Sequence, residues 1–367
     1  MKLGTVQFNG VAPIQTIDQF KIKPSDPILI YDRFHNMIDE ITMYGGLSYT
    51  KTLNGIGQAQ FIVGIESNKA TPDNLKFFNH VEIYKGGRLE WAGIIVMVSF
   101  NDPAITVSCY GYMHLLKTRR CREKTYPTLT YGNLLAEMLA ETNLLEDTGI
   151  TVGSIAAGSL ETTRKVRNTD YILDKMLDFI DDGNYNLEID DNRHLNFYLR
   201  KGSVKPYVAE YGGDNDNIIV KPRVDMNTLE MANSVFAEID NESGIMSSWM
   251  EDTGSQAIYG LLEGTYSAND SIILQDTLDA YVSSELQRRS YPIQSINLSI
   301  VDSTMCPFDD IYVGDSITVS LIPYWGFKQQ LRILEIKHNE DTGVRDLVVG
   351  SILFRQQKPV KKLYKGG

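Results

Sequence analysis

The chain is poor in the features that mark secreted and membrane-spanning proteins. It has three cysteines in 367 residues, Cys109, Cys121 and Cys306, and no CxxC spacing. They predict reduced, partly buried thiols in a chain that folds in the cytosol. The first residues, Met1–Val6, lack the apolar core of a signal peptide. The most apolar run, Ile94–Val98, is far too short to span a bilayer.

Positive charge is also scarce. The chain has 35 Lys and Arg against 47 Asp and Glu, which gives a net charge of −12 and a pI of about 5.0. This balance argues against a surface that wraps nucleic acid by neutralising phosphates. The one basic cluster, Arg119–Arg122, is interpreted as an intersubunit salt-bridge patch, with a nucleic-acid contact as the alternative. The length predicts two or three domains.

Motifs for catalysis are absent or out of context. Gly314-Asp315-Ser316 is similar to the nucleophile block of GDS-type esterases, in which the serine comes early in an α/β fold. Here the block lies in the last 60 residues, within an antiparallel pattern. The one histidine after it, His338, lies on a predicted strand, and nothing places it beside Ser316 as a base. A Gly-Asp turn that enters a strand is the favoured interpretation. No phosphate-binding Gly-Lys loop is present.

The histidines and the acidic pairs show no spacing that predicts a metal or catalytic site. Zinc needs three or four convergent ligands, and the histidines are isolated in sequence, so we expect structural or exposed side chains. Acidic pairs could serve a glycosidase or a Ca²⁺ site, but they fall at predicted helix ends and turns, where Asp is usually solvated. We therefore predict no catalytic, cofactor-binding or metal-binding residues and no enzyme activity. The residues considered are His35, His80, His114, His194 and His338, and the pairs Asp181-Asp182, Asp190-Asp191 and Asp309-Asp310.

What the chain does contain is a β unit near its C-terminus, between Asp310 and Phe354. Three runs alternate apolar and polar residues, as half-buried strands do. A hairpin tip at Pro323–Gly326 and a polar turn at Asn339–Gly343 separate them. The pattern predicts a three-stranded antiparallel meander. Its runs are Asp310–Leu321, Gln330–His338 and Gly343–Gly350.

An earlier stretch, residues 81–111, repeats this order. A strand at Val81–Tyr84 leads through a Gly-Gly turn into a strand at Leu89–Val98, and a short polar loop leads to Ile105–Tyr110. Two copies of one β unit in a single chain are the main prediction from the sequence. If they are copies, Trp91 and Leu331–Ile336 lie in corresponding second strands.

Two further hairpins are expected before residue 81. The first joins Ile28–Tyr31 to Met37–Ile41, and the second joins Ser48–Leu53 to Gln58–Val63. Residues 1–26 are expected to form an extended arm with one candidate strand, Thr5–Phe8. With 81–111 this gives about seven strands and no long helix, which favours an antiparallel barrel or sandwich.

Residues 117–210 change in character. One helix is predicted with Thr128 or Thr130 as its cap, and a second with Asn168 or Thr169 as its cap and Gly183 at the C′ position. A hairpin of 185–189 with 194–199 follows. We predict a small α+β domain between the two β units. The apolar helix positions are Leu134, Leu135, Met138, Leu139 and Leu145, then Ile172, Leu173, Met176, Leu177 and Ile180.

The last part begins with a linker at Tyr211–Asn217 and a strand at Ala232–Ile239. Residues 240–268 have weak periodicity and are expected to form a loop or mobile excursion. A helix with Leu278, Tyr281, Val282 and Leu286 and a strand at Ile293–Ile300 precede the meander. The basic tail is expected to fray. The expected domains are 1–116, a first β-barrel with an N-terminal arm; 117–210, α+β; 211–357, a second β-barrel with an inserted loop and helix; and 358–367, the basic tail.

In its order of segments the chain resembles the tail-hub (baseplate hub) family of tailed bacteriophages, which includes the N-terminal part of siphophage tail-associated proteins. The resemblance covers about 28–355, and the order of the motifs and the β repeat carry it. It implies a mainly β chain with an α+β insertion: two tail-tube-like antiparallel β-barrels joined by small α+β domains. The segments are Ile28–Tyr31, Val81–Gly93, Ile105–Leu116, Val313–Val319, Leu331–Ile336 and Leu347–Gly350.

The resemblance also implies a function and partners. Three chains would present six barrels in a pseudo-hexameric ring at the distal tip of a phage tail, in a virion assembled in the host cytoplasm. Implied partners are two further copies of the chain, a hexameric distal tail or tail tube protein, the tape-measure protein, and tip fibre or receptor-binding proteins. Genomic DNA would only pass through, and we expect an acidic bore with Lys358–Lys365 outside it.

Two alternative functions remain open at the sequence level. Many relatives continue into a peptidoglycan hydrolase or fibre domain, and the chain ends at Gly367 without one, so we expect no lytic activity. A peptidoglycan-degrading enzyme would use acidic residues in 181–191. A host-surface carbohydrate-binding protein would use the loop 240–268.

Overall fold

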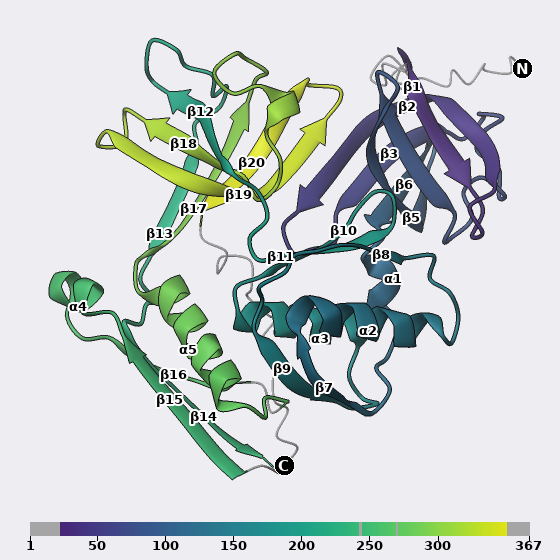
Figure 1. Ribbon diagram of the computed structural model, residues 1–367. Helices are drawn as coiled ribbons and strands as arrows, with labels where there is room; N and C mark the ends of the chain where they lie inside the picture. The colour runs from purple at the N-terminus through teal and green to yellow at the C-terminus, as the bar shows by residue number, and fades with distance from the viewer. Residues whose placement is uncertain (1–22, 242–243, 269–270, 351–367) are drawn as a thin grey trace, which may run out of the picture.

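The computed structural model describes residues 23–241, 244–268 and 271–350, and 49% of this described part is strand and 17% helix. The candidate strand Thr5–Phe8 and the basic tail 358–367 lie outside the described residues. Figure 1 shows two β units side by side at the top, with an α+β unit and a smaller sheet-and-helix unit below them. In the described part of the chain, no helix is long and apolar enough to cross a membrane.

The first β unit is a closed ring of six antiparallel strands around a buried apolar core. The strands follow the order β1-β4-β5-β6-β3-β2, and β2 pairs back with β1. Phe61, Trp91 and Val107 point into the core, each at most 1% exposed. The strands are β1 (Lys23–Tyr31), β2 (Met37–Thr52), β3 (Gln58–Gly64), β4 (His80–Lys85), β5 (Arg88–Asn101) and β6 (Ala104–Gly111).

Both predicted hairpins are present, but two predicted strands are one. The predicted strands Met37–Ile41 and Ser48–Leu53 both lie, apart from Leu53, in the 16-residue strand β2. The register of β2 against β3 shifts between Gly45 and Ser48, and Gly46 has a φ of 60°. A bulge of this kind bends a strand without ending it. The first half of β2 can therefore pair with β1 and the second half with β3.

The second β unit has six strands in a comparable order, β12-β18-β19-β20-β17-β13. It differs from the expected antiparallel pattern at one place, because β12 pairs with β18 in parallel. Among the described residues no strand pairing joins β12 to β13, so both are edges. All of β12 except Tyr211 lies in the segment 117–210 that was expected to form the α+β domain, yet it pairs with β18 of the second β unit. The strands are β12 (Val204–Tyr211), β13 (Arg223–Asn227), β17 (Ile293–Ile300), β18 (Ser316–Leu321), β19 (Phe327–Asn339) and β20 (Val344–Gly350).

The predicted order of the two meanders is confirmed. β4-β5-β6 and β18-β19-β20 are both antiparallel, with Trp91 in β5 and Leu331–Ile336 in β19. They also share an irregularity that no sequence pattern predicted. β5 shifts register against β6 between Ile95 and Met97, and β19 shifts against β20 between Ile333 and Glu335. A bulge at the same place in both copies bends the long second strand and curves each sheet.

The two β units form one continuous sheet. The end of β2, Ser48–Thr52, pairs antiparallel with Glu335–Asn339 at the end of β19. β1 pairs with β2 only as far as Tyr44, and β18 pairs with β19 only as far as Arg332. The remaining part of each long strand therefore has one free edge, and these two edges pair with each other. These hydrogen bonds fix the position of the second unit relative to the first.

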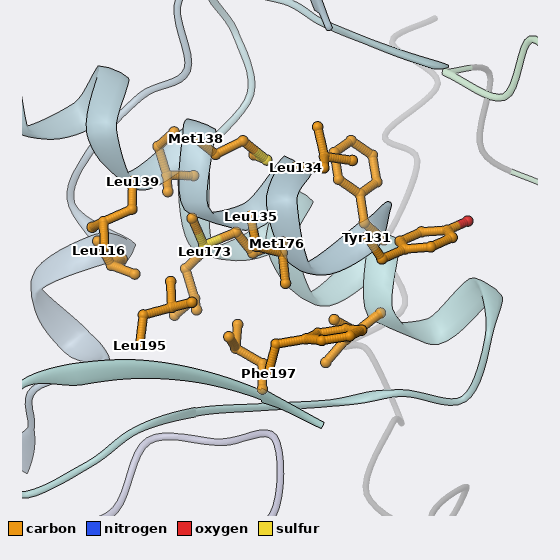
Figure 2. Packing of buried hydrophobic residues seen from close by; sticks show 14 of the residues in the cluster. Leu116, Tyr131, Leu134, Leu135, Met138, Leu139, Leu173, Met176, Leu195 and Phe197 are labelled. Atoms are coloured by element: carbon orange, nitrogen blue, oxygen red, sulfur yellow. The ribbon is translucent and has the colours of Figure 1, made fainter. Parts of the chain in front are cut away.

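The α+β unit lies below this joined sheet and packs two helices over short strands. Figure 2 shows α2 and α3 meeting β11 around Leu135, Met176 and Phe197, all fully buried. Its elements are α1 (His114–Lys117), β7 (Lys124–Thr130), α2 (Tyr131–Asn143), β8 (Thr151–Ile155), β9 (Glu161–Val166), α3 (Ile172–Asp182), β10 (Asn186–Ile189) and β11 (His194–Tyr198).

The helix ends differ from the prediction in detail. α2 ends before Leu145, which is 56% exposed, and its N-cap Thr130 makes no side-chain capping bond. The N-cap of α3 is Tyr171, not Asn168 or Thr169. Gly183 is the C-cap with φ −111°, and Asn184, with φ 54°, takes the left-handed position. The amide of Tyr185 then donates to the carbonyl of Ile180, which closes a Schellman-type end.

The expected loop 240–268 is instead a folded unit. β14 (Ser234–Asn241), β15 (Gly244–Glu251) and β16 (Glu263–Tyr266) form a three-stranded sheet, with α4 (Thr253–Tyr259) before β16. α5 (Gln275–Arg289), the predicted helix, packs on β14 and β15. The weak periodicity arose because the outward side chains of the sheet mix apolar, small and acidic residues.

Candidate functional site

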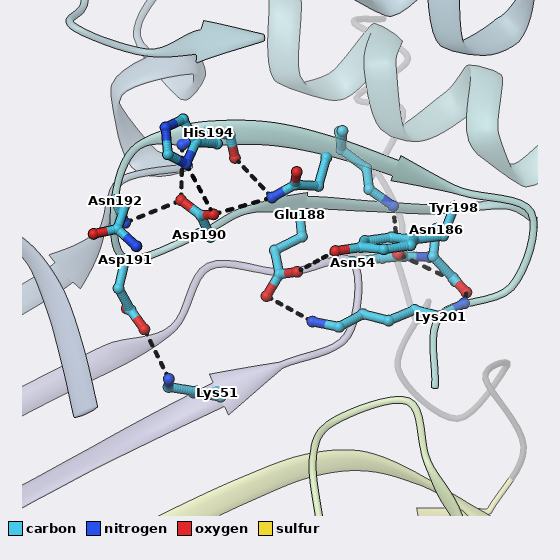
Figure 3. Close-up of polar contacts among 12 residues, drawn as sticks. Lys51, Asn54, Asn186, Glu188, Asp190, Asp191, Asn192, His194, Tyr198 and Lys201 are labelled. Carbon is cyan, nitrogen blue, oxygen red and sulfur yellow. Dashed lines mark hydrogen bonds and ion pairs between the residues drawn. The ribbon is translucent and has the colours of Figure 1, made fainter. Parts of the chain in front are cut away.

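A polar junction holds the α+β unit against both β units. The turn between β10 and β11 inserts Asp191 into the first unit, as Figure 3 shows. Its carboxylate binds Nζ of Lys51 at 2.7 Å and accepts a hydrogen bond from the buried amide of Ala92 at 2.9 Å. Burial raises the pKa of Asp191 while Lys51 lowers it. The expectation of a solvated aspartate is wrong here, because the partners come from β2 and β5.

The neighbouring Asp190 shapes the turn itself. Its carboxylate accepts from the amides of Asn192 and His194 at 3.0 and 2.8 Å, and it contacts Nδ1 of His194 at 3.2 Å (Figure 3). Side-chain bonds of this kind stabilise a tight turn. One aspartate of the predicted pair therefore builds the loop, and the other binds the neighbouring unit.

Two asparagines and an arginine extend the junction to the second β unit. Oδ1 of Asn54, at the β2–β3 turn, accepts from the amide of Leu187 at 3.1 Å. Oδ1 of Asn186 accepts from Nη2 of Arg332 at 2.6 Å, and Arg332 also donates to the carbonyls of Lys201 and Gly314. Burial lowers the pKa of Arg332 to about 10. Arg332 lies on β19, so it ties the α+β unit to the second unit.

A cavity of about 130 Å³ lies where the three units meet, lined by Lys51, Trp91, Leu187, Asp191 and Val313 among others. Both lysines of the junction bind carboxylates: Lys201 binds Glu188 at 2.6 Å, and Lys51 binds Asp191 at 2.7 Å. This arrangement suits a clamp between rigid units better than a catalytic centre, because paired charges are poorly placed to act on a substrate.

The esterase-like block is part of the same framework. The Asp315 carboxylate accepts from the amides of Ser203 and Tyr312 at 2.7 and 3.0 Å. Ser316 is 4% exposed and begins β18 opposite Arg332. His338 lies six residues further along β19, which is roughly 20 Å at strand spacing. Ser316 and His338 are therefore not brought together.

The histidines are dispersed, with one exception that sequence reasoning missed. His35 and His80 were expected to be isolated, but the centroids of their rings lie 5.2 Å apart. Nε2 of His35 contacts Glu82 at 3.2 Å, and burial lowers the pKa of His80 to about 4. His114 and His338 pack on Tyr110 and Tyr49. Within 23–241, 244–268 and 271–350, no group of three His, Cys, Asp or Glu could hold a metal.

The pair Asp181-Asp182 was also expected to be solvated, and for Asp182 this prediction is wrong. Asp182 is 2% exposed and binds Arg164, which is fully buried, and the hydroxyl of Tyr131. Burial raises the pKa of Asp182 to about 6. Asp181 lies near Arg288 of α5 at 3.8 Å. The partners come from α2, β9 and α5, so spacing within the pair could not reveal them.

The remaining candidates lie on the surface or in the core. Asp309 is exposed and binds Arg88 of the first unit at 2.9 Å. Arg119, from the basic cluster, binds Glu146 at 3.3 Å within the chain. The three cysteines are free and fully buried rather than partly buried, and burial raises the pKa of each thiol.

Exposed apolar side chains mark candidate assembly surfaces, which the sequence alone did not locate. Trp325, at the β18–β19 hairpin tip, is 99% exposed, and its φ of 56° holds it in the left-handed region. Phe100 and Phe34 lie at hairpins of the first unit. Trp is enriched among the residues that contribute most to binding at protein interfaces, so the hairpin tip with Trp325 is a candidate contact surface.

The chain matches no known family profile, and no curated protein matches it in sequence. Solved structures do match its fold, and three of them are tail proteins. Prophage tail protein gp18 of Listeria monocytogenes EGD-e has a TM-score of 0.64 at 15% identity, covering 89% of this chain and 94% of that one.

Two more tail proteins match over the same share of this chain, 89%. The 43 kDa tail protein of prophage MuSo2 from Shewanella oneidensis has a TM-score of 0.64 at 14% identity over 98% of its length. The tail protein from Neisseria meningitidis MC58 has a TM-score of 0.65 at 10% identity over 97% of its length. The chain has the fold of the prophage tail proteins, consistent with the tail-hub resemblance.

Proposed function

We propose that this chain is a structural hub protein at the distal end of a phage tail or tail-derived particle, and not an enzyme. The observation that carries the proposal is the six-strand order that occurs twice in one chain. Two related units per chain let three chains present six similar units. Such a ring matches a hexameric tail ring on one side and keeps three-fold symmetry on the other.

The unpaired edges of the second unit support assembly. β12 and β13 each have one strand partner among the described residues, and β12 carries Pro206, which is typical of an edge. Exposed edges and apolar tips such as Trp325 are liabilities for a monomer. We infer that neighbouring chains, a distal tail or tube ring, the tape-measure protein and tip proteins cover these surfaces.

The net charge of −12 supports a bore through which DNA slides. Like charges keep a duplex away from the wall, whereas a basic wall would bind its phosphates. We propose a net negative inner surface of the trimer. Charge mapped on a solved ring tests this, and a bore richer in Lys and Arg than in Asp and Glu would contradict it.

Assembly is tested by light scattering coupled to size exclusion, followed by negative-stain imaging. We expect a homotrimer with a three-fold ring, formed alone or on its tail partner. A particle that stays monomeric when the partner ring is present would overturn the proposal. The test variant is Trp325→Ala at the β18–β19 hairpin tip, and the matched control is Lys328→Ala, an exposed residue beside the same tip.

No observation favours the peptidoglycan-degrading alternative, because Asp182 and Asp191 are bound to Arg164 and Lys51. For carbohydrate binding, deletion of 240–268 is a poor test, because it would remove two of three strands of a sheet. Trp249→Ala is the sharper variant, since this exposed ring can be removed without removing a strand.

A further inference from the structure

The sheet-and-helix unit has a one-sided charge distribution. Between Arg223 and Arg288 the sequence contains twelve Asp or Glu residues and no Lys or Arg. Arg289, just beyond, binds Glu285 at 2.7 Å and Glu230 at 2.9 Å, so it neutralises only part of this charge. A segment of one sign creates a local potential that favours a partner of opposite charge.

The sheet of this unit has one covered face and one open face. Val235 and Ala237 point toward α5 and are fully buried, and Figure 1 shows α5 along one side of the sheet. The alternate residues Phe236, Ile245 and Trp249 point the other way and are 36%, 71% and 64% exposed. We call this surface, with its neighbours on β16, the open face.

The centre of the open face is apolar and ordered. Phe236 and Trp249 are directly opposite in the β14–β15 register. Nε1 of Trp249 donates to Oγ of Ser234 at 2.8 Å, which fixes the orientation of the indole. The rim is acidic and exposed: Glu238 and Asp240 lie on β14, Glu251 on β15 and Glu263 on β16.

An apolar centre with an acidic rim fits a segment that combines lysines with apolar side chains. This chain contains one. Residues 351–367 carry five Lys or Arg and no Asp or Glu. The basic residues are Arg355, Lys358, Lys361, Lys362 and Lys365, and the apolar ones include Phe354, Val360, Leu363 and Tyr364.

This segment leaves the described structure next to the unit with the open face. Gly350 pairs with Ser295 on β17. Five residues earlier, the carbonyl of Ser290 accepts from the hydroxyl of Ser255, and Asp252, the N-cap of α4, directly follows β15. The five residues from Ser290 to Ser295 span at most about 17 Å, whereas the seven residues 351–357, if extended, span about 23 Å. Lys358 can therefore reach the near end of the open face.

We propose that residues 354–365 of this chain bind across the open face of their own molecule. The apolar side chains cover Phe236 and Trp249, and the lysines lie along the carboxylates of Glu238, Glu251 and Glu263. The proposal replaces the expectation that the tail frays. It does not depend on the hub function, since it concerns a contact within one chain.

Zero-length carbodiimide crosslinking of the full-length protein tests proximity, because it joins lysine amines only to carboxylates in direct contact. We expect peptides that link Lys361, Lys362 or Lys365 to Glu238, Glu251 or Glu263, in product of monomer mass. Links found only in dimeric or larger product would show a tail bound to another copy and would overturn binding within one molecule. An absence of these links would overturn the contact.

Hydrogen exchange of the β15 amides tests the charge dependence. In K358E/K361E/K362E/K365E we expect exchange at least about tenfold faster than in the unaltered chain. The matched control replaces the same four lysines by arginine and should retain protection. Adding E238K/E251K to K358E/K361E/K362E/K365E should restore protection of the β15 amides, because the charges of the two surfaces are then exchanged and again opposite. Protection that follows protein concentration but ignores tail charge would assign the open face to a second copy and overturn the proposal.

Discussion

Replacing Arg164 by alanine is expected to destabilise the layer between the α+β unit and α5. The Arg164 side chain is fully buried, binds Asp182, and donates to the hydroxyl of Tyr131 at 2.8 Å. Its guanidinium carbon also lies 5.0 Å from the ring centroid of Phe179. Removing it leaves a buried carboxylate without its counter-charge, which costs about 3–5 kcal/mol of unfolding free energy at neutral pH.

The loss should depend on pH in a defined direction. Burial raises the pKa of Asp182 to about 6, although Arg164 lowers it. Without Arg164 this folded-state pKa rises further above the unfolded value of about 3.9. A group whose folded pKa is raised takes up a proton on folding, so stability is lost as pH rises through that interval. The penalty of Arg164→Ala should be small near pH 4 and largest above pH 7.

Urea unfolding followed by helical circular dichroism measures the effect, because α2, α3 and α5 surround the pair. The double variant R164A/D182N removes both charges and should cost less than the sum of the two single variants. Native-state hydrogen exchange in α3 gives a local reading. A penalty below about 1 kcal/mol, or one that is equal at pH 5 and pH 8, would refute this account of the pair.

Two other predictions concern the junction and the hairpin tip. Asp191→Ala should lower the unfolding free energy by about 1–2 kcal/mol and speed proteolysis between the units, because the buried amide of Ala92 loses its acceptor. The lost ion pair with Lys51 adds little, since the Lys51 side chain is 44% exposed. Asp214→Ala, on the exposed turn after β12, is the control, and equal proteolysis of the two variants would contradict the clamp. Trp325→Ala should change the unfolding free energy by less than about 0.5 kcal/mol relative to the unaltered chain and should reduce ring assembly. A large loss of stability with normal assembly would contradict an assembly role for Trp325.

Strand positions could be predicted from the sequence, but several of their partners could not. The alternation in 81–111 and 316–350 is local, so both meanders were visible. The parallel pairing of β12 with β18 joins Val204 to Ser316 across 112 residues, and periodicity contains no information on such a partner. β15 was missed because apolar residues lie on both of its faces, which removes the alternation: Met246 and Met250 face α5, whereas Ile245 and Trp249 face outward.

The polar contacts of the α+β unit were hidden for the same reason. Asp182 and Asp191 looked like ordinary residues of a helix end and a turn, since their partners Arg164 and Lys51 are remote in sequence. The two bulges at Val96 and Leu334 were equally invisible, because a bulge preserves the apolar character of a strand and changes only its register.

The pairing of β2 with β19 has a mechanical consequence. Five consecutive residue pairs, from Ser48–Asn339 to Thr52–Glu335, join the units edge to edge. A force along these strands loads all their hydrogen bonds in shear, so they must break together, whereas a force across them would open them one at a time. The two units of a chain should therefore twist and translate as one plate. In the proposed three-chain ring, the more flexible places would then be the three contacts between chains rather than the contact between the two units of one chain.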